Sequence, residues 1–465
     1  MFMFISARLK GKPDIAVVLV LTALATVAVV AKLLQYYGFL IHDWDTGIYS
    51  NVVWNLANGN WFHSDVLNRN DLGEHFSPII IVFVPFFMAY PSPVWLVAGQ
   101  GLAVGTTYFL LYFIALKIFC DANTKFAKPL ALGFAIWAFF YRPLTSALLS
   151  EFHPSTFATP LLAAAILALL HRRDRILWLL VAILLLAKEN APLAVLGLGC
   201  YAGLVLLRSR LGMALGIVAG VSAALILGLV MPHFRNGEWS HYGRLAPFAE
   251  WTRKSHYLFM LVKGLAFLPL AGWRGLLCAA PLLALNLSVK FAPQFSSNFH
   301  YDDFISVFLL VSAMHGTVIL FRGVDNVFKS WRAVVAFAVV ALVAIILVDP
   351  EASDALSYVQ NTWPGANERQ LRRELSVYSR LPGNVGIAAQ QSLGPYLSAR
   401  PRYVAIHPAA QAFNILRLKA GDKVLITPVG NEWEEFADLK RLFDNSPRLV
   451  RVHASPVLRV YEVKR

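Results

Sequence analysis

Apolar runs long enough to cross a membrane recur along this chain from residue 15 to about residue 348, and no other feature limits its fold so strongly. A helix needs ~20 mostly apolar residues to span the hydrocarbon layer. Hydrophobic residues make up 57% of the chain and charged residues only 15%, which a soluble protein of this size could not present to water without aggregating. We therefore expect an all-α polytopic membrane protein with about 11 transmembrane helices. The expected spans are 14–36, 94–118, 129–147, 155–171, 176–188, 190–207, 211–231, 257–271, 274–290, 303–321 and 332–348.

Basic residues in the short loops set the expected orientation. With a cytoplasmic N-terminus, the cytoplasmic loops hold about twice as many Lys and Arg residues as the outer loops, and the outer face is acidic. The first run lacks the cleavage site of a secretory signal, so we expect it to be retained. The protein is then a multi-pass protein of the cell (inner or plasma) membrane. Of the formal charge of +14, about +10 lies in the membrane part and follows from this topology, so no nucleic-acid partner is inferred.

The chain divides into two expected domains. Residues 1–348 are expected to form the transmembrane domain, with an outer loop at 37–93. We interpret the apolar piece of this loop, 78–90, as a re-entrant or juxtamembrane helix, because a crossing there would invert the orientation of every later basic loop. A short true span is the alternative. From residue 349 the hydropathy falls, and residues 349–465 are expected to form a small soluble α/β domain outside the cytoplasm. Its expected strands are 385–389, 403–406, 423–426, 449–453 and 457–463.

Ionisable residues at membrane depth are costly and therefore mark candidate functional sites. Five polar clusters are expected at the outer ends of helices or in outer loops, and this shared level predicts one site. We expect Asp45, Glu151, His75 and Lys188 to line a single cavity open to the outer leaflet. The clusters are 42–49, 74–78, 150–154, 188–190 and 298–303.

Carboxylates supply the candidate catalytic groups. Asp43 and Asp45, directly after the first expected helix, suit a general base acting on a hydroxyl acceptor, or ligands of a divalent cation such as Mg²⁺ or Mn²⁺. Helix capping is the alternative for either residue. Glu151 is a third candidate catalytic carboxylate.

Cationic, imidazole and phenol groups supply the candidate substrate-binding residues. Lys188 offsets phosphate charge in one interpretation and merely neutralises Glu189 in the other. A lone histidine is often structural, and the aromatic cluster before the tenth expected helix equally suits an interfacial anchor. The candidate binding residues are His75, Arg142, His153, Lys188, Glu189, His300 and Tyr301.

Several familiar sequence motifs are missing from the chain. It contains no Walker loop, no glycine-rich dinucleotide fingerprint on a strand, no Cys-x-x-Cys pair, no His-Glu-x-x-His and no Gly-x-Ser-x-Gly. ATP-driven transport and zinc proteolysis therefore lose most of their support.

Short motifs in a fixed order carry a resemblance to a known family. They are 45–49 (Asp-Thr-Gly-Ile-Tyr), 54–59 (Trp-Asn-Leu-Ala-Asn-Gly), 75–78 (His-Phe-Ser-Pro), Gln100, 151–154 (Glu-Phe-His-Pro), 188–190 (Lys-Glu-Asn), 300–301 (His-Tyr), 381–382 (Leu-Pro) and 397–400 (Leu-Ser-Ala-Arg). In order and spacing they resemble the predicted membrane proteins catalogued as domain of unknown function 2079. That family is in turn similar to the C superfamily of glycosyltransferases.

This resemblance implies a GT-C-like fold and an enzyme that takes a sugar from a polyprenyl-phosphate donor at the non-cytoplasmic face. Asp45 would be the acid of the first outer loop, with Asp43 as its neighbour. The segment 75–78 would occupy the place of a His-Pro-Pro element in lipid-linked mannosyl and aminoarabinose transferases. Ser77 departs from that element, which has proline there, and Asn190 stands where the family usually has aspartate.

The chemistry that the resemblance implies fits these residues. Asp45 would act as base in an inverting displacement, and Lys188, Arg142 or a bound divalent cation would stabilise the leaving phosphate. The expected partners are the lipid bilayer and a polyprenyl-phosphate-linked sugar, with an acceptor that the sequence does not specify. A transporter or flippase of a lipid-linked substrate and a non-catalytic assembly protein are the alternatives. Because the candidate residues crowd one side of the membrane, the transferase is preferred.

Overall fold

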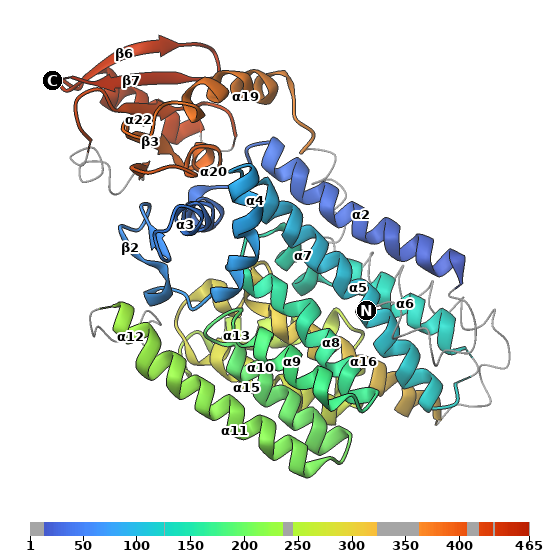
Figure 1. Cartoon of the computed structure of the whole chain (residues 1–465). Coiled ribbons are helices and arrows are strands. Elements are labelled where there is room, and N and C mark those ends of the chain that lie inside the picture. The colour runs from blue at the N-terminus through green and yellow to red at the C-terminus, as the bar shows by residue number, and fades with distance from the viewer. Residues whose placement is uncertain are drawn as a thin grey trace.

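A computed structural model describes residues 14–124, 126–235, 245–322, 362–406, 418–430 and 433–464. These residues form a bundle of helices with an ordered loop at one end and a C-terminal sheet beside that loop (Figure 1). The last expected span, 332–348, and the expected domain boundary at 348/349 lie outside the described residues. The division into two domains therefore stays a prediction.

Four described helices are long and apolar enough to cross a membrane, and a fifth crossing is available if a bent pair counts as one span. The pair is α6 (Ala127–Phe140) and α7 (Arg142–Leu149), and the angle between the two helices is 52°. The bend interrupts the expected span 129–147, and Pro143 lies just after it, in the first turn of α7. Other expected spans coincide with shorter apolar helices, so the number of crossings stays a prediction. The four are Ile15–Tyr37, Val94–Asp121, Ser209–Phe234 and His300–Leu320.

The described helices of the bundle follow one another along the chain, with the outer loop between the first two. They are α2 (Ile15–Tyr37), α5 (Val94–Asp121), α6, α7, η4 (Pro154–Phe157), α8 (Ala158–Leu170), α9 (Asp174–Leu184), α10 (Ala191–Cys200), η5 (Tyr201–Val205), α11 (Ser209–Leu225), η6 (Ile226–Val230), α12 (Met231–Phe234), α13 (Trp251–Lys263), α14 (Leu268–Ala271), α15 (Trp273–Ser288), η7 (Ala292–Phe295), η8 (His300–Asp302) and α16 (Asp303–Arg322).

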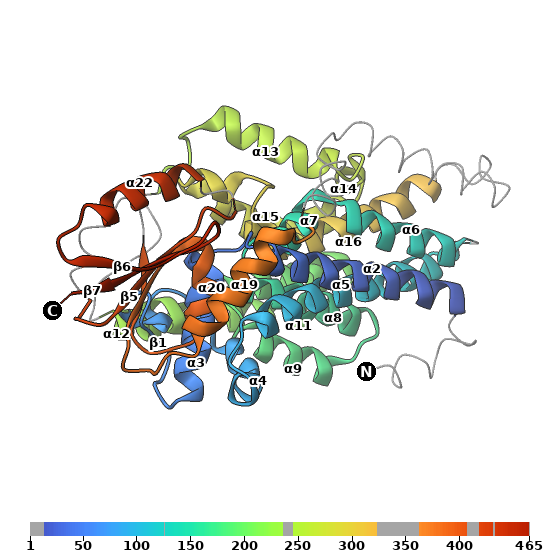
Figure 2. The ribbon, with the colours of Figure 1, turned by 90° about the horizontal axis from the view of Figure 1, so that it is seen from above.

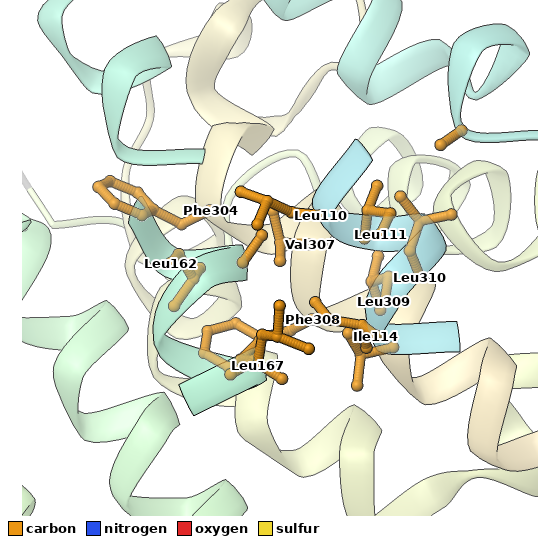
Figure 3. Packing of buried hydrophobic residues seen from close by; sticks show 14 of the residues in the cluster. Leu110, Leu111, Ile114, Leu162, Leu167, Phe304, Val307, Phe308, Leu309 and Leu310 are labelled. Atoms are coloured by element: carbon orange, nitrogen blue, oxygen red, sulfur yellow. The ribbon is translucent and has the colours of Figure 1, made fainter. Parts of the chain in front are cut away.

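Helices α5, α8 and α16 form the centre of the bundle. Their apolar side chains interdigitate, as Figure 3 shows for Leu110, Leu162 and Phe308. Within the most apolar 18 residues of each candidate span, 78% are buried in His300–Leu320, which contains most of α16, and 72% in α5. Only 17% are buried in Ser209–Phe234, which contains α11, η6 and α12. Helix α11 is therefore peripheral, at the edge of the bundle in Figure 1.

The segment between α2 and α5 is an ordered loop with its own apolar core. Tyr49, Phe62 and Phe83 pack there against Phe152 from the connection between α7 and η4. The piece 78–89 is a helix too short to span the hydrocarbon layer, in keeping with a juxtamembrane position. The elements of the loop are η1 (Asp43–Gly47), α3 (Ile48–Ala57), β1 (His63–Ser64), β2 (Arg69–Asn70), η2 (Asp71–Gly73), η3 (Pro78–Phe83) and α4 (Val84–Ala89).

The described residues from 362 onward, called the C-terminal region below, form a five-stranded mixed sheet in the order β4-β3-β5-β7-β6. Strand β3 is parallel to β4 and β5, whereas β7 is antiparallel to β5 and β6. The strands lie where the sequence predicts them. The elements are α19 (Ala366–Ser379), β3 (Ile387–Gln390), η9 (Gln391–Leu393), α20 (Gly394–Leu397), β4 (Tyr403–Ile406), β5 (Lys423–Ile426), α22 (Trp433–Asp444), β6 (Leu449–Ala454) and β7 (Arg459–Val463).

Two helices give this sheet its two apolar layers. Leu371 and Leu375 of α19 pack with one face, and Leu439 and Phe443 of α22 pack with the other. Seen from above in Figure 2, the sheet lies at one end of the bundle, next to α3 and the end of α2. The C-terminal region is thus placed against the loop that carries Asp45.

Candidate functional site

Asp45 lies in a five-residue π-helical turn, η1, directly after α2, and Glu151 fixes the two ends of this turn. One carboxylate oxygen of Glu151 accepts a hydrogen bond from the backbone N–H of His42 at 2.8 Å and lies 3.1 Å from its Nδ1. The other oxygen accepts a 2.5 Å hydrogen bond from the Thr46 hydroxyl. Both oxygens of Glu151 are therefore engaged in holding the turn, so its geometry fits positioning better than the predicted catalysis.

Buried polar side chains of the bundle in turn support the segment that carries Glu151. Lys32 of α2 donates to the carbonyl of Ser150 at 2.7 Å, and Gln100 of α5 donates to that of Ala147 at 2.8 Å. Lys32 and Gln100 are both fully buried. Lys32 was not among the predicted site residues, although a lysine inside an apolar run is a signal that could have found it.

Asp45 begins a continuous polar contact path. Its Oδ2 lies 3.3 Å from Nε2 of His153, whose ring stacks on that of His300 with 3.3 Å between the centroids. Nε2 of His300 lies 3.5 Å from the ammonium of Lys188, which is also 5.7 Å from the centre of the Tyr301 ring. Four of the five predicted clusters are thereby joined by direct contacts.

The surroundings of Asp45 keep its carboxylate ionised. Partial burial by itself raises the pKa of Asp45, but the neighbouring His153 and, to a smaller extent, the charges of His75 and Lys188 more than offset this. The pKa therefore lies below its usual range. About a third of the side chain remains exposed, so the charged group can meet a ligand.

A cavity of about 580 Å³ opens beside this path. Arg142, at the start of α7, lies on its wall, and its guanidinium donates to Oδ1 of Asn298 at 3.0 and 3.2 Å. Lys188 is outside the lining and contacts two of the lining residues, His300 and Tyr301. The predicted site residues that line the cavity are Asp45, Arg142, Glu151, His153, His300 and Tyr301.

His75 and Glu189 form a second contact, outside the lining of this cavity. Glu189 is buried, lies 3.0 Å from Nδ1 of His75 and accepts a 3.0 Å hydrogen bond from the N–H of Phe76. The carboxylate thus fastens the end of the outer loop to the turn between α9 and α10. Of the four residues expected to share one cavity, Asp45 and Glu151 line it, whereas His75 and Lys188 do not.

Asp43 does not face the cavity. It is 1% exposed and accepts a 3.0 Å hydrogen bond from the hydroxyl of Tyr403 in the C-terminal region. The two carboxylates therefore have different surroundings, and a metal site at Asp43 and Asp45 stays a prediction. Across the described ranges, no group of three or more His, Cys, Asp or Glu residues is arranged to hold a metal ion.

Asp71 was not among the predicted site residues, and its place in a polar loop gave no local signal. It is 1% exposed, and neither carboxyl oxygen has a hydrogen-bond partner within the part of the chain that the structure describes. Burial, together with the neighbouring Glu189, Glu74 and Asp45, raises the pKa of Asp71 to about 8. Asp71 is thus a neutral carboxylic acid at neutral pH.

Two crystal structures of ArnT from Cupriavidus metallidurans share the architecture of this chain. The structure bound to undecaprenyl phosphate aligns with a TM-score of 0.53 and 12% identity, covering 96% of this chain and 97% of ArnT. The apo structure gives 0.52 and 14% over the same shares. These alignments establish a common fold.

Sequence comparison gives the family. None of the curated proteins matches the sequence. The profile of one family, described as predicted membrane protein (DUF2079), matches residues 35–445, which include the outer loop, the bundle from α5 onward and most of the C-terminal region. The chain therefore belongs to the DUF2079 family of predicted membrane proteins, as its sequence motifs indicated.

Proposed function

We propose that this protein is a GT-C-type glycosyltransferase that moves a sugar from a polyprenyl-phosphate donor to an acceptor at the non-cytoplasmic face of the membrane. The observation that carries the proposal is the path from the ionised Asp45 through His153 and His300 to Lys188. It places a negative and a positive group at the two ends of one polar site, as sugar transfer away from a phosphate requires. The ArnT fold, seen with undecaprenyl phosphate bound, supports the same class of donor.

Asp45 is the proposed acceptor of the proton from the attacking hydroxyl. Its low pKa keeps it charged but makes it a weak base, so proton transfer follows rather than precedes attack on the anomeric carbon. As the new C–O bond forms, the hydroxyl becomes acidic enough to give its proton to this carboxylate. His153, 3.3 Å away, orients the carboxylate.

Lys188 and Arg142 are the proposed partners of the departing phosphate. Lys188 is 7% exposed, so its charge acts through a medium that screens it less than water does. Arg142 lies on the open wall of the cavity, where its planar guanidinium can pair with two phosphate oxygens. The displacement would invert the configuration at the anomeric carbon.

A separate apolar cavity supports a lipid-linked donor. It has a volume of about 650 Å³ and lies between η3, α2, α5 and α8. Val82, Phe86 and Leu102 on its lining are exposed, which suits contact with an isoprenoid chain in the bilayer.

The test measures consumption of a polyprenyl-phosphate sugar by membranes that contain the wild type or Asp45→Asn. Removal of the charge should lower turnover by at least ~10²-fold, the typical effect of losing a general base. Asp43→Asn, which keeps an acceptor for Tyr403, is the matched control and should lose much less. An EDTA arm tests whether turnover needs a divalent cation such as Mg²⁺ or Mn²⁺. Full activity of Asp45→Asn at normal expression would remove Asp45 as the base.

A further inference from the structure

The C-terminal region contacts the turn that carries Asp45 at two side chains. The hydroxyl of Tyr403 on β4 donates to the buried Asp43 at 3.0 Å. The indole N–H of Trp44 donates to the side-chain oxygen of Gln391 on η9 at 2.8 Å. Asp43 and Trp44 are the two residues that precede Asp45, so both contacts act on the backbone that aims its carboxylate.

The chain at Gly394, the first residue of α20, also passes so close to Asp43 that only glycine fits there. A Cβ atom added to Gly394 would lie 2.1 Å from Cβ and 2.9 Å from Cγ of Asp43. Such separations are far below van der Waals contact. The start of α20 and the π-helical turn are therefore fitted to each other directly.

A second group of contacts holds the segment just before the turn. The ring of Tyr396 stacks on those of Tyr36 and Phe39, with centroids 4.6 and 4.3 Å apart. The guanidinium of Arg372 lies 4.1 Å above the ring of Tyr37 and donates to its carbonyl at 2.9 Å. The end of α2 and the turn that follows it are thus both fastened to the C-terminal region.

We propose that the C-terminal region holds the Asp45 carboxylate in its reactive position, with Tyr403 and Gln391 as positioning residues. This inference rests on the proposed function of Asp45. A π-helical turn is rare and short because its own hydrogen bonds give it little stability, so its conformation needs support from outside. Glu151 supplies that support from the bundle side, and Tyr403 and Gln391 supply it from the opposite side.

The first experiment needs no activity and uses the full chain in detergent. Hydrogen–deuterium exchange of the peptide covering 43–50 is compared in the wild type, Tyr403→Phe and Tyr461→Phe. The control is matched because Tyr403 and Tyr461 are both 1% exposed on strands of the same sheet, but the hydroxyl of Tyr461 donates to Asp444 instead. Exchange should rise by at least about tenfold in Tyr403→Phe alone, as expected for losing a buried hydrogen bond that supports the turn.

The second experiment separates positioning from general stability. With a polyprenyl-phosphate sugar as substrate, Tyr403→Phe should lower kcat at least about tenfold and leave KM for the donor unchanged, because Tyr403 does not line the cavity. Asp43→Asn should keep most of the turnover, since its amide oxygen still accepts from Tyr403. Tyr461→Phe should behave as the wild type.

The outcomes distinguish this inference from the proposed function. Unchanged exchange at 43–50 in Tyr403→Phe overturns the inference, as does equal loss of turnover in both tyrosine variants. Faster exchange with unchanged kcat overturns it too, because the turn would then be loosened without consequence. If the wild type consumes no lipid-linked sugar, the proposed function fails, and the exchange measurement alone decides whether the C-terminal region holds the turn.

Discussion

Replacement of Asp71 by asparagine should remove a pH-dependent loss of stability from the folded protein. The carboxyl group of Asp71 is buried without a hydrogen-bond partner among the described residues, and its pKa is raised to about 8. In the unfolded chain an aspartate titrates near ~3.9. Between these two pH values the native protein binds one more proton than the unfolded chain, so wild-type stability falls as the pH rises and levels off above about 8.

The size of the effect follows from the same two pKa values. A carboxyl whose pKa moves from ~3.9 to about 8 lowers the free energy of unfolding by on the order of 5 kcal/mol at pH 8 and above. Water that enters the site when Asp71 ionises would reduce this figure, which is therefore an upper limit. Asparagine has nearly the same shape and does not ionise, so Asp71→Asn should be only slightly more stable than the wild type at pH 5 and clearly more stable at pH 8.5.

The assay is thermal unfolding of the purified protein in detergent at several pH values. We expect the Tm of Asp71→Asn to exceed that of the wild type by roughly 5 °C or more at pH 8.5. Asp438→Asn is the control, because the side chain of Asp438 is 76% exposed and gains nothing from losing its charge. Parallel curves of Tm against pH for the wild type and Asp71→Asn would refute the raised pKa.

Two further predictions concern the site and its orientation. Lys188→Gln should lower turnover of a polyprenyl-phosphate sugar by about 10²- to 10³-fold because it removes the buried positive charge. Lys290→Gln is the control, because Lys290 is exposed, and its turnover should not fall. Equal turnover in both variants would exclude Lys188 as the phosphate partner. The basic loops predict that a reporter fused after Arg465 is active outside the cytoplasm and that one fused after Arg173 is active inside it. A cytoplasmic C-terminus would overturn the placement of the whole site.

Hydropathy predicted one shared level for the polar clusters, and four of them are joined by contacts. Asp45 follows the first apolar run, His153 and Lys188 lie at connections between later runs, and His300 precedes another, so the sequence predicts one level for all four. Helix length fixes this level because each residue of a helix adds a constant rise. Hydropathy does not fix the direction of a side chain, which is why His75 turned out to contact Glu189 rather than line the cavity.

Contacts between distant segments left no pattern in the sequence. Asp43 and Tyr403 are 360 positions apart, and nothing near Asp43 indicated that its carboxylate faces the C-terminal region. Its position next to Asp45 instead favoured a shared role as base or metal ligand. The breaks in the helices were also hidden, since the run 257–271 contains Ala266 and Phe267, two residues with positive φ that hydropathy does not reveal.

The distribution of polar groups inside the bundle helps to decide between a transporter and a glycosyltransferase. A transporter of a lipid-linked substrate needs a polar path from one face of the membrane to the other. Below the Asp45 site, the described centre of the bundle is filled by apolar side chains from α5, α8 and α16, among them Leu110, Leu162 and Phe308 (Figure 3). Thr107 and Thr159 lie in the same bundle, but their hydroxyls pair with each other at 2.9 Å and offer nothing to a passing substrate. A phosphate group moved through this packing would lose its hydration without gaining a partner, which favours the proposed transfer over transport.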